Sequence, residues 1–430
     1  GDLSGATYAG SGSSSSTTCT FDDGPSNHVV KARIIDKDGG YTEYSTIVVV
    51  NNVAPTASLS NNGPVNEGSA ATVSFSAQSD PSSADTTAGF HYAYSCTNAS
   101  LASATYANTA GSTASKSCTF DDNGTYTVRA RIIDKDDGFT EYTTDVTVNN
   151  VAPTASLSNN GPVNEGSPAT ISFSNQLDPS NADTSAGFHY AFACDNGSLA
   201  GATYAGSGTS ASTTCTFNDN GSYTVKGRII DKDGGFTEYT TSVTVNNVAP
   251  TASLSNNGPV NEGSAATISF SGQSDPSSTD TTAGFHYAYA CDNSSLAGAT
   301  YAGSGTSASK SCTFDDNGTY TVRARIIDKD DGYTEYTTTV TVNNVAPTGT
   351  LSNNGPIGEG SSATISFSNQ HDPSAADTTA GFHYAYSCTN GDLSTATYAN
   401  TASNSDSTSC TFDDGPATKT VKARIIDKDG

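Results

Sequence analysis

Residues 122–154 read DNGTYTVRARIIDKDDGFTEYTTDVTVNNVAPT. Apolar and polar residues alternate along TYTVRARIID (125–134) and FTEYTTDVTV (139–148), and KDDG separates the two runs. An alternation with a period of two is typical of β-strands that bury one face, and a short Asp-Gly connection is typical of a β-hairpin. The stretch therefore predicts two long antiparallel strands, followed by the short linker NNVAPT.

The same text recurs along the 430-residue chain at a period of 97 or 98 residues. The valine of NNVAPT stands at 53, 151, 248 and 345, and GPVNEGSAATVSF (63–75) returns as GPVNEGSPATISF (161–173). Solenoid repeats are about 20–50 residues long, so this period indicates whole domains in tandem. We expect the C-terminal part of a domain at 1–51, complete domains at 52–149, 150–246 and 247–343, and a domain lacking its last strand at 344–430.

Within one copy, further alternating runs precede the hairpin: ATVSFSAQS (71–79), FHYAYSCT (90–97) and ASKSCTF (114–120). Loops rich in Gly, Pro, Asn and Asp separate them, and no stretch has helical spacing. Only 34% of the residues are hydrophobic, which suits several small cores better than one large core. The pattern predicts an all-β protein, a tandem array of antiparallel β-sandwich domains.

The composition excludes some classes of protein. With 43 acidic against 18 basic residues, the net charge is -25, and a nucleic-acid partner is not expected because it requires a basic face. No apolar run approaches the roughly 18 residues that span a bilayer. Because the chain has no Met, we expect it to be an excerpt from inside a longer array.

The stretch at 122–154 resembles the C-terminal half and exit linker of PKD-type immunoglobulin-like domains, which occur in large bacterial surface and secreted proteins. VNEGSAATVSFSAQSDPSSAD (65–85) is similar to their first half. The resemblance implies an immunoglobulin-like sandwich in each repeat. The WDFGDG motif of that family is absent, and YAYSCTN (92–98) stands in its place. We therefore expect Tyr94 to replace the core tryptophan, and no ligand of that loop is transferred. Tyr126 stands where sandwiches place a tyrosine corner.

The nine cysteines fall into one pair per repeat, 21 or 22 residues apart, plus Cys19. Zinc sites usually have CxxC pairs or added histidines at short spacing, which these pairs lack, so we expect intradomain disulfides. Disulfides imply an oxidising, extracytoplasmic compartment. We expect the partner of Cys19 to lie upstream of Gly1. The predicted pairs are Cys96 with Cys118, Cys194 with Cys215, Cys291 with Cys312, and Cys388 with Cys410.

Acidic side chains recur in a DPxxxD loop, in a DKDxG turn and in the NEG segment of each repeat. In a sandwich of this topology, the loop and the turn lie where the linker enters, and the NEG glutamate of the preceding domain lies there too. Several converging oxygens suit Ca²⁺, which takes six to eight of them. Asp-Gly turns are also good hairpin turns and acidic loops can simply be solvated, so both interpretations stay open. The candidate calcium ligands are Asp80, Asp85, Asp134, Asp136, Asp178, Asp183, Asp231, Asp233, Asp275, Asp280, Asp328, Asp330, Glu67, Glu165 and Glu262.

Three further features have weaker functional interpretations. The histidine of each GFHY segment, such as His91, is expected to be a strand residue on the face opposite Phe90 and Tyr92. Arg129 and Arg131 are expected to point away from the core and to pair with Glu141 and Asp145 across the hairpin. Asn-x-Ser/Thr sequons are candidate glycosylation sites, although they are frequent by chance in such a chain. The sequons start at Asn98, Asn123, Asn196, Asn220, Asn293 and Asn317.

Two functional hypotheses follow. The first is a non-enzymatic structural segment of an extracellular or cell-surface stalk, fibre or coat, whose partners are neighbouring repeats and other copies of the chain, with possible assembly into filaments. Catalysis is not expected, because the same acidic loops recur in every repeat and no repeat has a unique insertion. The alternative is an adhesive or carbohydrate-binding array that presents one aromatic platform per repeat to glycans. The candidate platform residues are Tyr8, Tyr106, Tyr204, Tyr301 and Tyr398.

Overall fold

The computed structural model describes residues 1–109, 111–401 and 403–430. Contacts within the chain define two compact units. Unit 1 comprises Gly1–Asn159, Thr170–Thr213 and Thr224–Ser242, and unit 2 comprises Asn160–Ala169, Thr214–Tyr223 and Val243–Gly430. The complete repeat at 52–149 therefore lies in unit 1 and the one at 247–343 in unit 2, whereas the repeat at 150–246 contributes to both.

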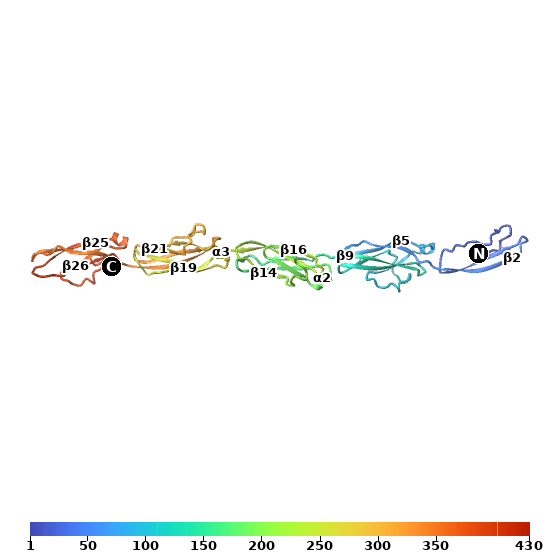
Figure 1. Cartoon of the computed structure of the whole chain (residues 1–430), viewed down its shortest axis with the longest axis horizontal. Coiled ribbons are helices and arrows are strands. Elements are labelled where there is room, and N and C mark those ends of the chain that lie inside the picture. The colour runs from blue at the N-terminus through green and yellow to red at the C-terminus, as the bar shows by residue number, and fades with distance from the viewer. Residues whose placement is uncertain (110, 402) are drawn as a thin grey trace. The chain divides into compact units, whose positions relative to one another are not determined.

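The repeat at 52–149 folds into seven strands and one short helix (Figure 1). Its elements are β3 (Thr56–Asn61), β4 (Val65–Asn66), β5 (Ala70–Ser79), α1 (Ser83–Ala88), β6 (His91–Ser95), β7 (Ser115–Thr119), β8 (Gly124–Ile133) and β9 (Phe139–Asn149).

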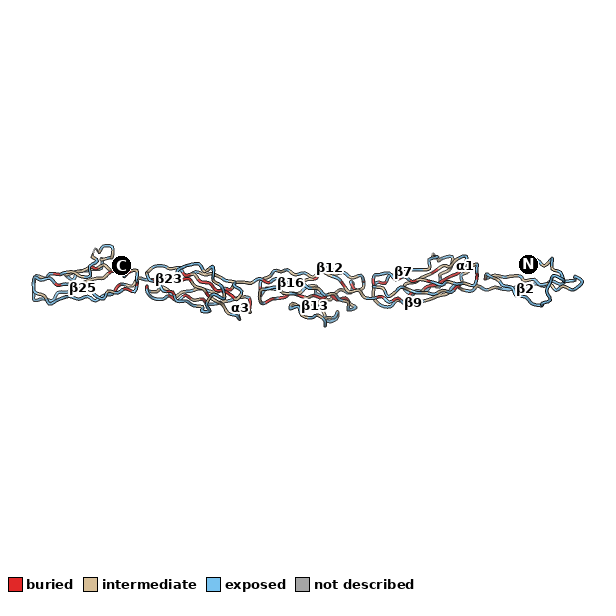
Figure 2. Tube along the Cα trace, turned by 90° about the horizontal axis from the view of Figure 1, so that it is seen from above, coloured by how far each residue is buried: buried red, intermediate tan, exposed pale blue. Residues whose placement is uncertain are grey.

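These strands form two layers. One sheet has the order β3-β5-β7 and the other has the order β4-β9-β8-β6. All pairs are antiparallel except the two-residue pair of β4 with β9, which is parallel. Alternate residues of β5 and β8, such as Val73 and Val128, are fully buried between the layers. Figure 2 shows the buried segments within the repeats. Burying one side chain of this size is worth about 1.5–3 kcal/mol.

The remaining elements of unit 1 and of the shared repeat have the following bounds: β1 (Ser26–Ile35), β2 (Tyr41–Val50), β10 (Thr154–Asn159), β11 (Val163–Asn164), β12 (Pro168–Leu177), α2 (Asn181–Ala186), β13 (His189–Ala193), β14 (Ser212–Thr216), β15 (Gly221–Ile230) and β16 (Phe236–Asn246). Those of unit 2 are β17 (Thr251–Asn256), β18 (Val260–Asn261), β19 (Ala265–Ser274), α3 (Ser278–Ala283), β20 (His286–Ala290), β21 (Ser309–Thr313), β22 (Gly318–Ile327), β23 (Tyr333–Asn343), β24 (Thr348–Asn353), β25 (Ser362–His371), α4 (Ala375–Ala380), β26 (His383–Ser387), β27 (Ser407–Thr411) and β28 (Lys422–Ile426).

Unit 2 repeats the arrangement of unit 1. Its sheets have the orders β17-β19-β21 and β18-β23-β22-β20, and the hairpin of β22 and β23 pairs Tyr320 with Val340, as β8 and β9 pair Tyr126 with Val146. The two-layer, mainly antiparallel arrangement confirms the predicted tandem immunoglobulin-like sandwiches. The exact domain boundaries stay predictions.

One prediction about local structure was wrong. The loop after β5 contains a one-turn helix, α1, although no helical spacing is visible in the sequence. The helix is short, and its residues are mostly polar, so it has no apolar stripe; Ser82 at its N-cap and Gly89 at its C-cap define its ends. Within the part of the chain that the structure describes, no helix is both long enough and apolar enough to cross a bilayer.

The arginines of β8 depart partly from their predicted placement. Arg129 and Arg131 both bind Glu141, as expected, but Asp145 accepts its hydrogen bond from Thr127 instead. Arg131 is only 6% exposed, because its guanidinium lies 3.7 Å from the centre of the Phe139 ring. Stacking on an aromatic face and pairing with a carboxylate offset the cost of burying this charge.

Two tyrosines have the roles expected from the sequence. Tyr126 Oη donates to the backbone O of Asp122 at 2.9 Å, which is the tyrosine-corner contact. Tyr94 packs against the buried residues of both layers and lies 5.9 Å, ring centre to ring centre, from Phe75. Tyr94 therefore contributes to the core between the two sheets, and its replacement of the tryptophan stays a prediction.

Candidate functional site

The loop between β5 and β6 fixes two aspartates at one end of the sandwich. Asp80 Oδ1 accepts a hydrogen bond from the backbone N of Ser82 at 2.8 Å. Ser82 Oγ in turn accepts one from the backbone N of Asp85 at 3.1 Å and caps α1. Side-chain oxygens at these positions satisfy N–H groups that have no partner within the helix. The result is an Asp85 side chain that is completely buried.

The turn between β8 and β9 is organised around the carboxylate of Asp134. Its Oδ1 accepts hydrogen bonds from the backbone N of Asp136 at 2.9 Å and of Gly138 at 2.8 Å. A Cβ at position 138 would lie 2.3 Å from Asp134 Oδ2, so the turn requires glycine there. The amide of Asn52, in the linker, donates to both Asp134 oxygens at 3.1 and 3.0 Å. The first Asp and the Gly of DKDxG therefore hold both the turn and the linker.

The lysine of the same DKDxG turn reaches the preceding repeat. Lys135 Nζ lies 2.6 Å from Asp23 Oδ1 and 3.2 Å from Asp85 Oδ1, and it also contacts Asp136. The hydrogen bonds to Asp136 and Asp23 raise the pKa of Lys135. The equivalent lysines repeat these contacts: Lys232 with Asp122, Asp183 and Asp233, Lys329 with Asp219, Asp280 and Asp330, and Lys428 with Asp316, Asp377 and Asp429.

A polar side chain of the preceding repeat also caps each short helix. Asp22 Oδ1 accepts from the backbone N of Ser83 at 3.0 Å, and Asp121 Oδ1 accepts from that of Asn181 at 3.0 Å. In unit 2, Asn218 and Asp315 make the same contact with α3 and α4. Each such contact joins residues about 60 positions apart. Two neighbouring residues of the preceding repeat, such as Asp22 and Asp23, therefore bind the helix and the DKDxG turn of the next repeat.

The glutamate of NEG lies on the other side of each junction. Glu67 is 1% exposed, and its Oε1 accepts from the linker N of Val151 at 2.7 Å. Gly68, at a φ of 71°, lies so close to the next repeat that a Cβ there would be 3.1 Å from Pro179. Glycine is favoured on both grounds, the positive φ and the close approach. Glu165 and Glu262 bind Val248 and Val345 in the same way, at 2.7 and 2.6 Å.

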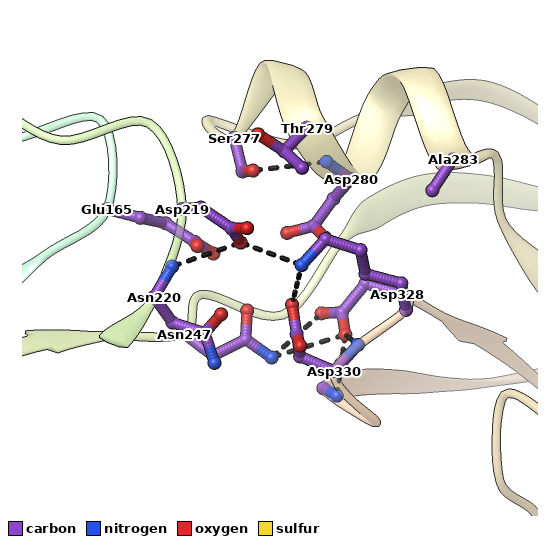
Figure 3. Close-up of polar contacts among 12 residues, drawn as sticks. Glu165, Asp219, Asn220, Asn247, Ser277, Thr279, Asp280, Ala283, Asp328 and Asp330 are labelled. Atoms are coloured by element: carbon purple, nitrogen blue, oxygen red, sulfur yellow. Dashed lines mark hydrogen bonds and ion pairs between the residues drawn. The ribbon is translucent and has the colours of Figure 1, made fainter. Parts of the chain in front are cut away.

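The NEG segment, the DPxxxD loop and the DKDxG turn place their carboxylates close together in small groups. In unit 1, oxygens of Glu67, Asp178 and Asp183 lie within 4.8 Å of one another, as do those of Asp122, Asp183 and Asp233. Glu165, Asp275 and Asp280 form the corresponding group in unit 2. Figure 3 shows this junction, with the carboxylates of Glu165 and Asp280 facing each other from neighbouring repeats. The structure thus brings together the NEG and DPxxxD residues that the sequence singled out.

The electrostatics of the groups reflect burial and like charge. Burial, together with the charges of Asp183 and Asp178, raises the pKa of Glu67. Burial also raises the pKa of Asp178, and it raises that of Asp183 to about 6 although Lys232 favours the charged form. Buried carboxylates this close together are stabilised either by a proton that two of them share or by a bound cation.

The sequence interpretation assigned no role to the lysine of the DKDxG turn. Its signal is present in the letters, because Lys135, Lys232, Lys329 and Lys428 all stand between two aspartates in DKD. The acidic residues of that turn are candidate calcium ligands by sequence, and in the structure Asp136 and its counterparts contact an ammonium. Metal binding by the remaining carboxylates stays a prediction.

In the repeat at 52–149 the disulfide links the end of β6 with β7, and the other described disulfides link the equivalent strands of their repeats. Cys96 is bonded to Cys118, Cys291 to Cys312, and Cys388 to Cys410, and Cys194 and Cys215 are in disulfide form. The second cysteine of each described bond is 1% exposed. Among the residues described, Cys19 is a free, exposed thiol.

The remaining candidates occupy the surface of the sandwich. His91 Nδ1 lies 2.6 Å from the backbone O of Tyr106, and the two rings stack at 3.8 Å. The proposed platform tyrosine is thereby held in place, and its hydroxyl donates to the backbone O of Ala88. The sequon residues Asn98, Asn196 and Asn293 are exposed, whereas Asn123, Asn220 and Asn317 are half-buried in the turn before the tyrosine corner. Glycosylation stays a prediction.

No protein-family model and no curated protein matches the chain. Among solved structures, it is similar to Sidekick-1 immunoglobulin domains 1–5, with 13% identity and a TM-score of 0.29 over 73% of this chain and 66% of that one. It is also similar to the Protocadherin GammaB4 extracellular domain, with 8% identity and a TM-score of 0.28 over 94% and 77%. The fibronectin(III)-like modules of Clostridium thermocellum CbhA match with 18% identity and a TM-score of 0.17 over 44% and 95%. Likenesses this distant carry no argument about function, and the fold rests on the strands described above.

Proposed function

We propose that the chain is a non-enzymatic structural segment of an extracellular stalk, fibre or surface coat, in which tandem sandwiches are joined through built junctions. The observation that carries this proposal is the repetition of the same contacts at successive junctions. At each, a lysine of one repeat binds an aspartate of the preceding one, as Lys329 binds Asp219 at 2.7 Å. Selection for joined repeats accounts for such repetition better than selection for one active site.

An extracellular location is part of the proposal. Only 34% of the residues are hydrophobic, and the repeats beginning at 52, 247 and 344 each contain a disulfide, a bond that persists in oxidising compartments. We also propose that Ca²⁺ binds at the junctions, because oxygens from two repeats converge there. Self-association of copies into filaments is a further element of the proposal, and sedimentation of the purified chain at increasing concentration tests it.

Mechanical unfolding of the full chain tests the structural role. If the repeats are separate load-bearing elements, stretching one molecule in optical tweezers gives a series of similar unfolding steps. Adding reductant lengthens each step, because the 21-residue segment closed by Cys291 and Cys312, and its counterparts, then also extend. A single cooperative event, or extension without resistance, contradicts the proposal.

A second candidate is an adhesive array that binds glycans, and the fixed tyrosine favours it. The backbone N of Tyr301 donates to Asp331 Oδ1 at 2.7 Å, its hydroxyl donates to Ala283 O at 3.2 Å, and its ring stacks on His286. A ring held in this way loses little entropy when a sugar stacks on it. Replacing the equivalent tyrosines by Ala removes glycan binding if this candidate is correct, and unchanged binding excludes the tyrosine platform.

A further inference from the structure

We propose that each junction carrying a NEG glutamate is a mixed-cation site. One divalent cation of the Ca²⁺ class is held by Glu165, Asp275 and Asp280, or by their counterparts. The lysine of DKD is the permanent cation of the neighbouring carboxylate group. This inference deepens the calcium element of the proposed function and rests on it. It specifies which residues bind each ion and how many ions the chain binds. It also specifies that the carboxylate group around the lysine binds no metal.

Two neighbouring carboxylate groups at a junction differ in their counter-ion. At the junction in unit 1, Asp122, Asp183 and Asp233 surround Lys232 Nζ, which lies 2.7 Å from Asp122 and 3.2 Å from Asp183. The ammonium therefore already sits where these three oxygens converge. The second group, Glu67, Asp178 and Asp183, shares Asp183 with the first. Of the three carboxylates in this second group, the one that contacts Lys232 is that of Asp183.

The second group contains buried carboxylate oxygens without hydrogen-bond partners among the described residues. Glu67 is 1% exposed, and among residues 1–109, 111–401 and 403–430 its Oε2 has no hydrogen-bond partner. Asp178 Oδ2 is buried and in the same condition within that part of the chain. Glu165 Oε2 and Asp275 Oδ2 repeat the pattern in unit 2. A buried charged oxygen without a partner is strongly unfavourable unless a proton or a cation compensates it.

The first aspartate of each DKDxG turn is already engaged by hydrogen bonds. Asp328 Oδ1 accepts from the backbone N of Asp330 at 2.9 Å and of Gly332 at 2.8 Å, and the amide of Asn247 donates to both of its oxygens. Four N–H contacts leave this carboxylate poorly placed to bind a metal. The cation ligands therefore reduce to the glutamate of one repeat and the two DPxxxD aspartates of the next.

The spacing of the oxygens fits a single ion. Ca²⁺ binds oxygens at about 2.3–2.6 Å, so the ligands of one ion lie up to about 5 Å apart. The oxygens of Glu165, Asp275 and Asp280 lie within 4.8 Å of one another. The three oxygens are therefore close enough together to bind one ion, and that ion would join two successive repeats.

Calcium titration of the full chain by calorimetry tests the inference, after chelator treatment and at physiological ionic strength. We expect three ions per chain, one each at the sets containing Glu67, Glu165 and Glu262. The Glu165→Gln variant should bind two, because Gln keeps the oxygen that accepts from Val248 N but loses the charge. Glu335→Gln, on the outer face of β23, is the matched control and should still bind three.

The lysine is tested in the same titration. Lys329→Met removes the ammonium from Asp219, Asp280 and Asp330, so the variant should bind four ions. Lys428→Met, at the next junction, should do the same. Absence of binding at millimolar calcium, an unchanged count in Glu165→Gln, or an unchanged count in both lysine variants would overturn the inference. If no calcium binds while the repeats still unfold in separate steps under load, the mixed-cation site fails and the structural array stands.

Discussion

Lys329 Nζ lies 2.7 Å from Asp219 Oδ1, although 110 residues of chain separate the two. The same lysine contacts Asp280, a completely buried residue in the first turn of α3 in the same repeat as the lysine. One ammonium therefore neutralises a buried charge within a repeat and binds the preceding repeat. The interface between repeats and the stability of the individual repeat thus depend on the same side chain.

Replacing Lys329 by Met should destabilise its repeat by about 1–3 kcal/mol, because Asp280 then keeps a buried charge without a cation. Thermal or urea unfolding of the full chain in chelator measures this effect. Lys310→Met is the control, since Lys310 is an exposed residue of β21. Equal stability of the Lys329 and Lys310 variants would contradict the role assigned to Lys329.

Removing one disulfide should cost its repeat about 3 kcal/mol. The double variant Cys291→Ala, Cys312→Ala opens a loop with a sequence separation of 21 and should unfold at lower urea concentration than the other repeats. Cys19→Ser, which changes an exposed free thiol, should leave unfolding unaltered. A double variant as stable as the parent chain would show that the bond does not stabilise the sandwich.

The tyrosine corner gives a conservative test. Tyr320→Phe removes one hydrogen bond, from the hydroxyl to Asp316 O at 2.8 Å, and keeps the stacking of the ring on Phe314. We expect a loss of about 1 kcal/mol in the free energy of unfolding. Tyr333→Phe is the matched control, because the repeat at 52–149 already has Phe139 at that position. Tyr320→Phe should be the less stable of the two variants, and equal stability would show that the corner hydrogen bond does not stabilise the repeat.

The ion pairs on the outer face of the hairpin predict a dependence on pH. Hydrogen bonds from Arg325 and Arg323 lower the pKa of Glu335 below its ordinary 4.5. Because the folded-state pKa is the lower one, the stabilisation is present above about pH 4.5 and is lost as the pH falls through the folded-state value. Glu335→Gln should thus lower stability at pH 7, by less than about 1 kcal/mol, and make no difference in strong acid. A difference that grows on acidification would have the wrong sign.

The sequence predicted those parts of the fold that have a periodic pattern. Alternation located β5 to β9, and the repeat period separated one sandwich from the next, because each strand buries every second side chain. The helix at Ser83–Ala88 was missed since its six residues, four of them polar and two alanine, carry no apolar period, and one of its first N–H groups is bound by Asp22 of the preceding repeat. Strand β3 was also missed: TASLSN alternates, but the run is short and its apolar residues, Ala57 and Leu59, are only partly buried.

The junction was predicted in outline. Topology alone indicated that Glu67 would meet Asp178 and Asp183, and the structure places them together. Which carboxylates accept backbone N–H groups, as Asp134 does, and which one receives a lysine depends on distances that sequence spacing does not give. The burial of Arg131 under Phe139 likewise depends on how the two side chains stack across the hairpin.

Hydrogen–deuterium exchange at the linker amides tests the central claim, that the repeats are joined through built junctions, most directly. The backbone N of Val345 donates to Glu262 Oε1 at 2.6 Å, so this amide should exchange as slowly as those of the flanking strands. Glu262→Ala should remove that protection at Val345 and leave Val151 protected by Glu67. Exchange of the NNVAPT amides in the unmodified chain at the rate of an unstructured peptide would contradict the account.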